Sequence, residues 1–253
     1  MNPFDETEAD RWDRHAAWWQ AQFTDGADPE YEEQILPLAE RWLAGRQRVL
    51  EVGTGEGQVA RRVAAGGATV LGLDLSTRQV ATAVERGGGP VYARGSVEAL
   101  PVRDGWADGV VACLVFEHVE RVDEAIAEVA RVLEPGGRFA FFLNHPLIQT
   151  PDSGWIDDQI IDPPEQYWRV GAYLQEQMTI ELMDQGIDIR FVHRPLGRYV
   201  NALLANGLVL EHMDEPAPPP GFLARAPEYA QAADIPRLLL LVCRKVEGWT
   251  NGV

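Results

Sequence analysis

Apolar positions along this chain follow two patterns that indicate helices and strands in alternation. Apolar residues at spacings of three and four indicate helices with one buried face, and short unbroken apolar runs indicate buried strands. The predicted helices cover residues 5–23, 30–44, 58–65, 76–86, 122–133 and 195–205. The predicted strands cover residues 48–52, 69–73, 90–93, 108–114, 138–143, 208–213 and 237–244. This alternation predicts an α/β fold: a doubly wound, mostly parallel sheet with helices on both faces.

The alternation stops after residue 145. Residues 146–190 are rich in Pro, Asp, Gln and aromatic residues, and they show no clean strand period. We therefore expect an N-terminal helical lid (1–45), a ligand-binding core (46–145), an insertion (146–190) and the remainder of the core sheet (191–253), all in one structural domain. The lid assignment depends on an aromatic helix that precedes a Gly/Pro break, a plausible hinge.

The composition limits the partners. The 253 residues include 22 Lys and Arg against 39 Asp and Glu, a formal net charge of −17. Phosphate backbones repel such a chain, so we expect no nucleic-acid partner. No apolar run approaches the ~20 residues that span a bilayer, and no signal peptide is visible, so we expect a cytoplasmic protein without a membrane partner. No histidines stand at metal-ligand spacing, so we expect no metal.

The most informative motif is VLEVGTGEG at residues 49–57. A strand runs into glycines at alternate positions, and a predicted helix follows. Gly53 and Gly55 allow a sharp turn and leave no Cβ to block a ligand. The next strand ends at Asp74, where a carboxylate accepts hydrogen bonds from two vicinal ribose hydroxyls. Such an acidic residue serves NAD and S-adenosylmethionine equally well.

Three details favour S-adenosylmethionine, a methyl donor, over a dinucleotide. The glycine spacing is G-x-G-x-G, and Gln58 stands where a dinucleotide loop has its third glycine. Glu51 precedes the first glycine by two residues, where a carboxylate meets the cationic methionine end of the ligand and repels a pyrophosphate. No GxxxxGK[ST] loop is present. A nucleotide- or dinucleotide-binding module without methyl transfer remains the alternative.

Several ordered motifs extend the pattern. They are GSVEALP at 95–101, WADGVV at 106–111, FEHV at 116–119 and RVLEPGG at 131–137. With the glycine loop, residues 48–143 resemble the class I S-adenosylmethionine-dependent methyltransferases, particularly the bacterial group that acts on small metabolites. The resemblance implies a Rossmann-like sheet of seven strands whose last strand is antiparallel. It also implies S-adenosylmethionine as cofactor and a small-molecule acceptor. The attacking atom (O, N or C) and the oligomeric state stay open.

The resemblance also assigns cofactor-binding residues. Glu51 and the loop residues Gly53, Thr54 and Gly55 line the methionine portion, and Asp74 holds the ribose. The remaining positions carried over are Leu75 on the adenine, Ser96 and Val97 at the adenine edge, and Leu114 near the methionine. The family usually has Asp at the position of Ser96. Because a hydroxyl is a neutral acceptor, we expect it to bind the adenine amino group less strongly than a carboxylate.

Methyl transfer needs positioning above all, and a general base helps when the acceptor is a hydroxyl, by ~10²–10⁴-fold. His145 directly follows the strand at 138–143 and is the leading candidate for this base; the alternative is a hydrogen bond to its own loop. His118 is the less favoured candidate, with a structural role as its main interpretation.

Aromatic residues provide candidates for the acceptor pocket. Because the family often closes an N-terminal helix over its ligand, the resemblance implies this role for Trp18 and Tyr31, whereas the helical stripe that contains Trp12 and Trp19 is interpreted as core. In the insertion, Trp155 and Trp168 are predicted to form a water-excluding wall. The alternative for the insertion is a satellite core beneath a long loop.

Overall fold

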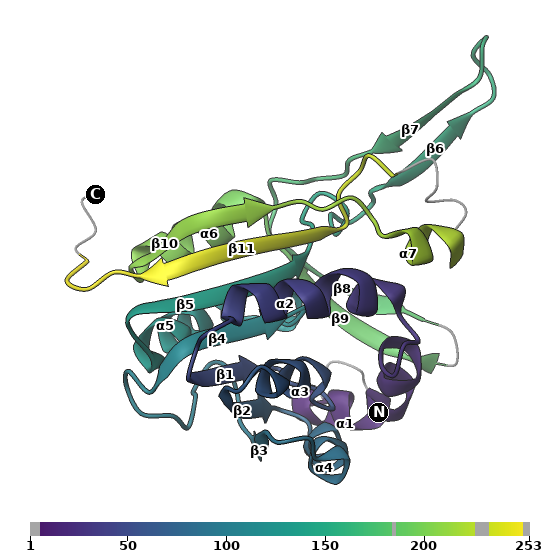
Figure 1. The fold of residues 1–253 in the computed structure, drawn as a ribbon. Coiled ribbons are helices and arrows are strands. Elements are labelled where there is room, and N and C mark those ends of the chain that lie inside the picture. Colours follow the sequence, from purple (N-terminus) through teal and green to yellow (C-terminus); the bar gives the residue numbers. More distant parts are fainter. Residues whose placement is uncertain (1–5, 184–185, 226–232, 250–253) are drawn as a thin grey trace.

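A seven-stranded sheet forms the centre of the computed structural model, which describes residues 6–183, 186–225 and 233–249 (Figure 1). The strand order is β10–β11–β5–β4–β1–β2–β3. The strands are β1 (Arg48–Val52), β2 (Thr69–Asp74), β3 (Val91–Arg94), β4 (Ala107–Cys113), β5 (Leu133–Asn144), β10 (Leu208–Asp214) and β11 (Leu238–Lys245). Strands β1 to β5 run parallel, and β11 pairs antiparallel with β5 and β10. The predicted seven-stranded fold with an antiparallel last strand is confirmed.

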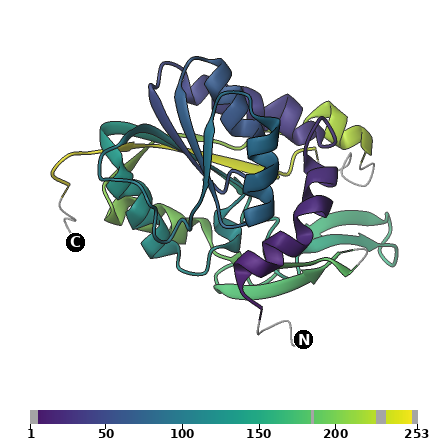
Figure 2. The same ribbon diagram turned by 90° about the horizontal axis from the view of Figure 1, so that it is seen from below.

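Helices cover both faces of the sheet (Figure 2). The described helices are α1 (Glu8–Phe23), α2 (Leu36–Leu43), α3 (Gln58–Ala65), α4 (Thr77–Arg86), α5 (Val122–Val132), α6 (Leu196–Ala205) and α7 (Pro220–Arg225), with a π-helical turn η1 (Tyr31–Ile35) and a 3₁₀ turn η2 (Phe116–His118); α1 and α7 lie beside the sheet and not on its faces. Strand β5 shows how the two cores arise. Phe139 and Phe141 pack in one buried cluster, and Ala140 and Phe142 pack in the other, because successive side chains point to opposite faces.

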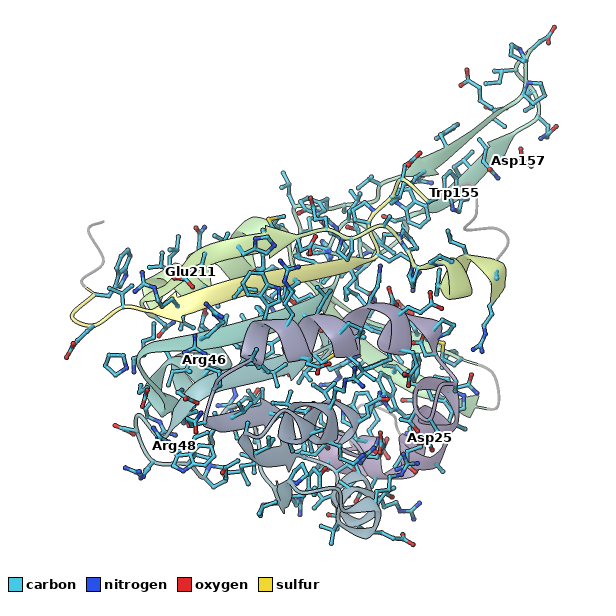
Figure 3. All side chains as sticks on the ribbon, in the orientation of Figure 1. Asp25, Arg46, Arg48, Trp155, Asp157 and Glu211 are labelled. Carbon is cyan, nitrogen blue, oxygen red and sulfur yellow. The ribbon has the colours of Figure 1, made fainter. Side chains whose placement is uncertain are left out.

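The insertion is more regular than the sequence indicated. It contains the antiparallel pairs β6 (Gly154–Asp158) with β7 (Glu165–Arg169) and β8 (Gln177–Leu182) with β9 (Asp188–His193). Most side chains of β7 are exposed on both faces, so no alternation of apolar and polar residues marks it as a strand. Figures 1 and 3 show the β6–β7 hairpin projecting from the body, with Trp155 and Asp157 on it.

Strand β9 is different because it packs into the body. Ile189 and Phe191 are buried, and Figure 2 shows α1 crossing beside the β8–β9 pair. This places part of the insertion against the N-terminal helix. Among the described helices, none combines the length and apolar character needed to cross a membrane.

Candidate functional site

A cavity of about 420 Å³ lies at the carboxyl ends of β1, β2 and β4, with α1 on its other side. This is the edge of a parallel sheet at which ligands bind in doubly wound folds. The structure brings all nine of the predicted cofactor residues to its wall. They are Glu51, Gly53, Thr54, Gly55, Asp74, Leu75, Ser96, Val97 and Leu114.

The backbone of the glycine loop leaves room for a ligand to approach it closely. Gly53 and Gly55 have φ values of +69° and +54°, in the left-handed region that favours glycine. A Cβ on Gly53 would collide with the Val115 side chain. A Cβ on Gly55 would meet no atom within 4 Å, and Gly55 lines the cavity. A side chain at position 55 would therefore occupy space that the loop keeps open for a ligand.

Asp74, the last residue of β2, holds the glycine loop through a hydrogen bond to its backbone. Its Oδ2 accepts a hydrogen bond from the Gly55 backbone N–H at 2.8 Å, and its Oδ1 accepts one from the Ser76 N–H at 2.8 Å. Burial raises the pKa of this carboxyl, although the two backbone donors work in the opposite direction. Each oxygen retains a further lone pair, so the rigidly held group can still accept hydrogen bonds from a ligand.

Glu51 is a buried carboxyl at the end of β1, with 2% of its surface exposed. Its Oε2 accepts a hydrogen bond from the Thr54 hydroxyl at 2.6 Å. Burial raises the pKa of Glu51 to about 8, and the nearby carboxyls of Glu56 and Asp74 contribute in the same direction. A cation in the cavity beside Glu51 would favour the ionised form and lower this pKa.

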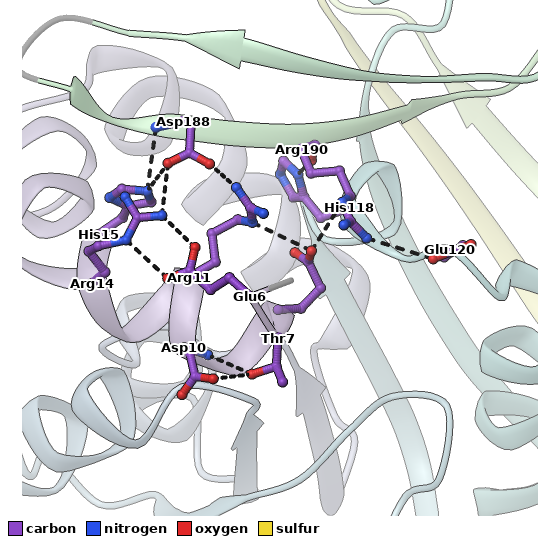
Figure 4. Close-up of polar contacts among 11 residues, drawn as sticks. Glu6, Thr7, Asp10, Arg11, Arg14, His15, His118, Glu120, Asp188 and Arg190 are labelled. Carbon is purple, nitrogen blue, oxygen red and sulfur yellow. Dashed lines mark hydrogen bonds and ion pairs between the residues drawn. The ribbon is translucent and has the colours of Figure 1, made fainter. Parts of the chain in front are cut away.

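Helix α1 closes the cavity and is attached to β9 by ion pairs (Figure 4). Asp188 of β9 forms ion pairs with the buried Arg11 and with Arg14 Nη2 at 2.8 Å, and its Oδ1 lies at hydrogen-bond distance, 3.1 Å, from His15 Nε2. Two residues further along β9, Arg190 Nε lies 3.1 Å from Oε1 of Glu8. Residues two apart on a strand share a face, so one side of β9 receives one face of α1.

His118 stands in the cavity wall at the end of η2. The turn is anchored by fully buried Phe116 and by Glu117, whose Oε1 accepts hydrogen bonds from the backbone and side-chain nitrogens of Asn144. The Nδ1 of His118 lies 2.7 Å from the carbonyl oxygen of Arg190, so Nδ1 donates. The Nε2 atom therefore keeps its lone pair, and the described residues give it no hydrogen-bond donor.

Aromatic rings enclose this imidazole. The Trp12 ring lies edge-on at 5.0 Å between centroids, and the Phe191 ring lies at 4.7 Å. Burial lowers the pKa of His118 to about 4, which keeps the ring neutral at physiological pH.

Comparison with known proteins identifies this arrangement. A family model described as a methyltransferase domain matches residues 50–141. The crystal structure of an S-adenosylmethionine-dependent methyltransferase from Mesorhizobium loti is 30% identical, with a TM-score of 0.71, and the match covers 85% of this chain and 97% of that protein. The chain belongs to the S-adenosylmethionine-dependent methyltransferase family.

Other relatives are methyltransferases as well. The structure of a putative S-adenosylmethionine-dependent methyltransferase from Listeria monocytogenes is 26% identical, with a TM-score of 0.71, over 86% of this chain and 98% of that one. A ubiquinone biosynthesis O-methyltransferase from Dechloromonas aromatica is 34% identical over 53% of this chain and 61% of its own length. A ubiquinone/menaquinone biosynthesis C-methyltransferase from Methylobacterium nodulans is 39% identical over 36% of this chain. The matches span 61% and 40% of the lengths of these two curated relatives.

The structure corrects the expectation that His145 faces the acceptor of this methyltransferase. The backbone N–H of Leu147 donates to His145 Nδ1 at 3.1 Å, so Nε2 carries the proton, and it lies 2.7 Å from Oε1 of Glu215. The residue is 6% exposed and does not line the cavity. Both ring nitrogens are thus engaged, and the structure brings His118 to the cavity instead.

Two of the four predicted pocket aromatics need the same correction at the insertion. Trp155 and Trp168 pack on each other in a T-shaped pair, 5.6 Å between centroids, on the β6–β7 hairpin. They do not line the cavity, because the hairpin points away from the body (Figure 3). The part of the insertion that reaches the cavity of the methyltransferase is β9, through Arg190.

The aromatic residues of the N-terminal segment that line the cavity differ in part from the two that we expected. Tyr31 lines the cavity as predicted, but Trp18 does not; it packs against the rings of Trp19 and Phe23. Trp12 and Trp19, interpreted as core, line the cavity. Sequence reasoning missed these two and Glu8, although their spacing places all three on one face of α1.

Proposed function

We propose that the protein transfers the methyl group of S-adenosylmethionine to a small-molecule acceptor held beneath α1. The observation that carries this proposal is the pair of carboxyls, Glu51 and Asp74, on either side of a glycine loop that keeps open space at Gly55. Glu51 also argues against the dinucleotide alternative, because a pyrophosphate beside the loop would meet this carboxyl. The net charge of −17 argues against a nucleic-acid acceptor.

The residues fit the cofactor. Asp74 has lone pairs for two ribose hydroxyls, and Glu51 is placed to receive the methionine ammonium. Leu75, Ser96 and Val97 border the adenine in this arrangement, and Leu114 borders the methionine portion. When bound, S-adenosylmethionine supplies a methyl group on a positively charged sulfur, which makes that carbon electrophilic.

His118 is the residue that we assign to the acceptor. Its neutral Nε2 accepts a hydrogen bond from an acceptor hydroxyl and so orients the oxygen. Nε2 would take the hydroxyl proton, while the bound cofactor would supply the methyl group and keep the electron pair of its carbon–sulfur bond. The proton then leaves to solvent. A pKa of about 4 makes the imidazole a weak base, so orientation is the larger part of this role.

Helix α1 excludes water from the reacting groups. Trp12 and Trp19 line the cavity and turn apolar surface toward it. The contacts of Asp188 with Arg11, Arg14 and His15 attach the helix that carries these rings to β9. Several relatives act on small molecules by name, such as the ubiquinone biosynthesis O-methyltransferase, which supports an acceptor of this size.

The test is a turnover assay with methyl-labelled S-adenosylmethionine and an extract of small metabolites. We expect label to appear in one or a few small products together with S-adenosylhomocysteine, and Asp74→Asn to abolish both at limiting cofactor. Label that appears in macromolecules alone, or not at all while the cofactor binds, would contradict the proposal.

A further inference from the structure

We infer that the acceptor is an uncharged hydroxyl compound, and that two ion pairs in the cavity wall, Glu8–Arg190 and Glu98–Arg121, select against anionic acceptors. This inference rests on the proposed function, because it concerns the part of the cavity that the cofactor residues leave to the acceptor.

Both arginines that line the cavity are already paired with carboxylates. Arg190 Nε lies 3.1 Å from Glu8 Oε1, and its Nη1 lies 3.7 Å from Glu120 Oε2. Arg121 donates from Nε to Glu98 at 3.1 Å, with a second, shorter bond from Nη2 to the same oxygen. Among the described residues, three carboxylates therefore face two guanidinium groups, so the positive charge of this part of the wall is already balanced by carboxylates of the protein.

Elsewhere in the wall, the described residues add no positive charge. Apart from the two pairs and Glu120, the charged residues that the described part of the chain brings to the cavity are Glu51, Glu56 and Asp74, and no described lysine lines it. Glu56 is neutralised by Arg61 at 2.6 Å and Arg86 at 2.7 Å, which do not line the cavity. A carboxylate acceptor would thus enter a site of negative potential and lose its hydration without a new partner, and both effects weaken its binding.

The uncharged surface favours a hydroxyl on an apolar body. Val97, Val115 and Val119 line the cavity together with Trp12 and Trp19. The neutral Nε2 of His118 is a hydrogen-bond acceptor in this wall, so it matches a hydroxyl proton. An ionised carboxylate offers no proton for this bond.

A matched pair of ligands tests the inference: 4-hydroxybenzoate and its methyl ester, which share a phenol and differ by one negative charge. Binding to the full chain saturated with S-adenosylhomocysteine is measured by calorimetry. We expect the neutral ester to bind at least about tenfold more tightly, since like charges in a binding site cost several kcal/mol. Equal or tighter binding of 4-hydroxybenzoate would overturn the inference. Failure of the ester and of other neutral phenols to bind, with S-adenosylhomocysteine still bound, would overturn it as well.

Substitutions then test the ion pairs themselves. Glu8→Gln leaves the Arg190 charge uncompensated by α1, so we expect the preference for the ester to fall several-fold. Glu98→Gln should likewise lower the preference for the ester, because it leaves the Arg121 charge uncompensated. Neither Glu98 nor Arg121 belongs to α1, so this variant tests the effect independently of that helix. Glu6→Gln is the matched control, because Glu6 pairs with Arg14 outside the cavity. An unchanged preference in both cavity variants would overturn the role of the pairs. Loss of S-adenosylhomocysteine binding by the unaltered protein would instead count against the proposed function.

Discussion

The Nδ1 of His118 donates a hydrogen bond to the main-chain carbonyl oxygen of Arg190 at 2.7 Å. This contact fixes the tautomer of a histidine in the cavity and leaves Nε2 as an acceptor. The side chain of the same Arg190 pairs with Glu8 of α1. Strand β9 therefore orients the imidazole with its backbone and holds the covering helix with its side chains.

His118→Ala should lower kcat by about 10²-fold for a hydroxyl acceptor, because it removes the group that orients the hydroxyl and takes its proton. Cofactor affinity should change little. His145→Ala is the matched control, since that histidine is bonded outside the cavity, and it should keep most of the activity. Steady-state kinetics with separate cofactor titrations check this. A larger loss of kcat in the His145 variant would reverse the assignment.

Cofactor binding should release a proton from Glu51. In the empty protein the pKa of Glu51 is about 8, so the group is largely protonated at pH 7. The methionine ammonium lowers this pKa, so the bound form holds fewer protons and affinity rises with pH up to about 8. Calorimetry of S-adenosylhomocysteine in two buffers of different ionisation enthalpy measures the release. Glu51→Gln should bind more weakly and remove the buffer dependence; an equal dependence in that variant would place the proton elsewhere.

Asp74→Asn should weaken S-adenosylhomocysteine binding by about 2 kcal/mol or more, because charge-assisted hydrogen bonds to the ribose are lost. Asp108→Asn is a close control. Asp108 also accepts two backbone hydrogen bonds, from Gln47 and Arg48, but does not line the cavity. Isothermal titration of both variants separates a ligand contact from a general loss of stability. Equal affinities in the two variants would show that Asp74 does not bind the cofactor.

Asp188→Asn should loosen α1. The substitution removes the Asp188 carboxylate from Arg11, which is 2% exposed and, among the described residues, keeps the longer carboxylate contact with Glu8 at 3.5 Å, and breaking a buried pair costs up to about 3–5 kcal/mol. Hydrogen exchange in residues 8–23 should become faster while the sheet keeps its protection. Asp123→Asn breaks an exposed pair with Arg198 and should leave α1 unchanged. Exchange in α1 that matches the unaltered protein would mean that the Asp188 pairs do not hold the helix.

The sequence predicted the parts of the fold whose patterns are local. Residues 48–52 and 58–65 form the expected strand and helix with the same bounds, and the helix predicted from residue 76 is α4, which Ser76 caps through its side chain. The glycine loop and Asp74 were identified because the spacing of the glycines, and the place of Asp74 at the end of the next strand, can be read directly from the sequence. The resemblance to the methyltransferase family supplied the adenine- and methionine-side candidates, and all nine candidate cofactor residues line one cavity.

The part of the cavity that we assign to the acceptor depends on contacts between residues far apart in the chain, which the spacing of residues in the sequence does not reveal. Arg190 and His118 are 72 residues apart in sequence, and only the fold brings them together. His145 follows β5 as expected, but Glu215 from a distant loop engages its ring. Trp12 and Trp19 form a stripe that looks like core, because a helix face that covers a ligand is as apolar as one that covers a sheet.

The central claim, that this cavity binds S-adenosylmethionine, is tested most directly by a thermal-shift titration of the purified chain with S-adenosylhomocysteine and with NAD. We expect S-adenosylhomocysteine at ~100 Kd to stabilise the protein by ~2.7 kcal/mol, and NAD at the same concentration to produce no shift. Stabilisation by NAD with none by S-adenosylhomocysteine would show that the cavity does not bind S-adenosylmethionine.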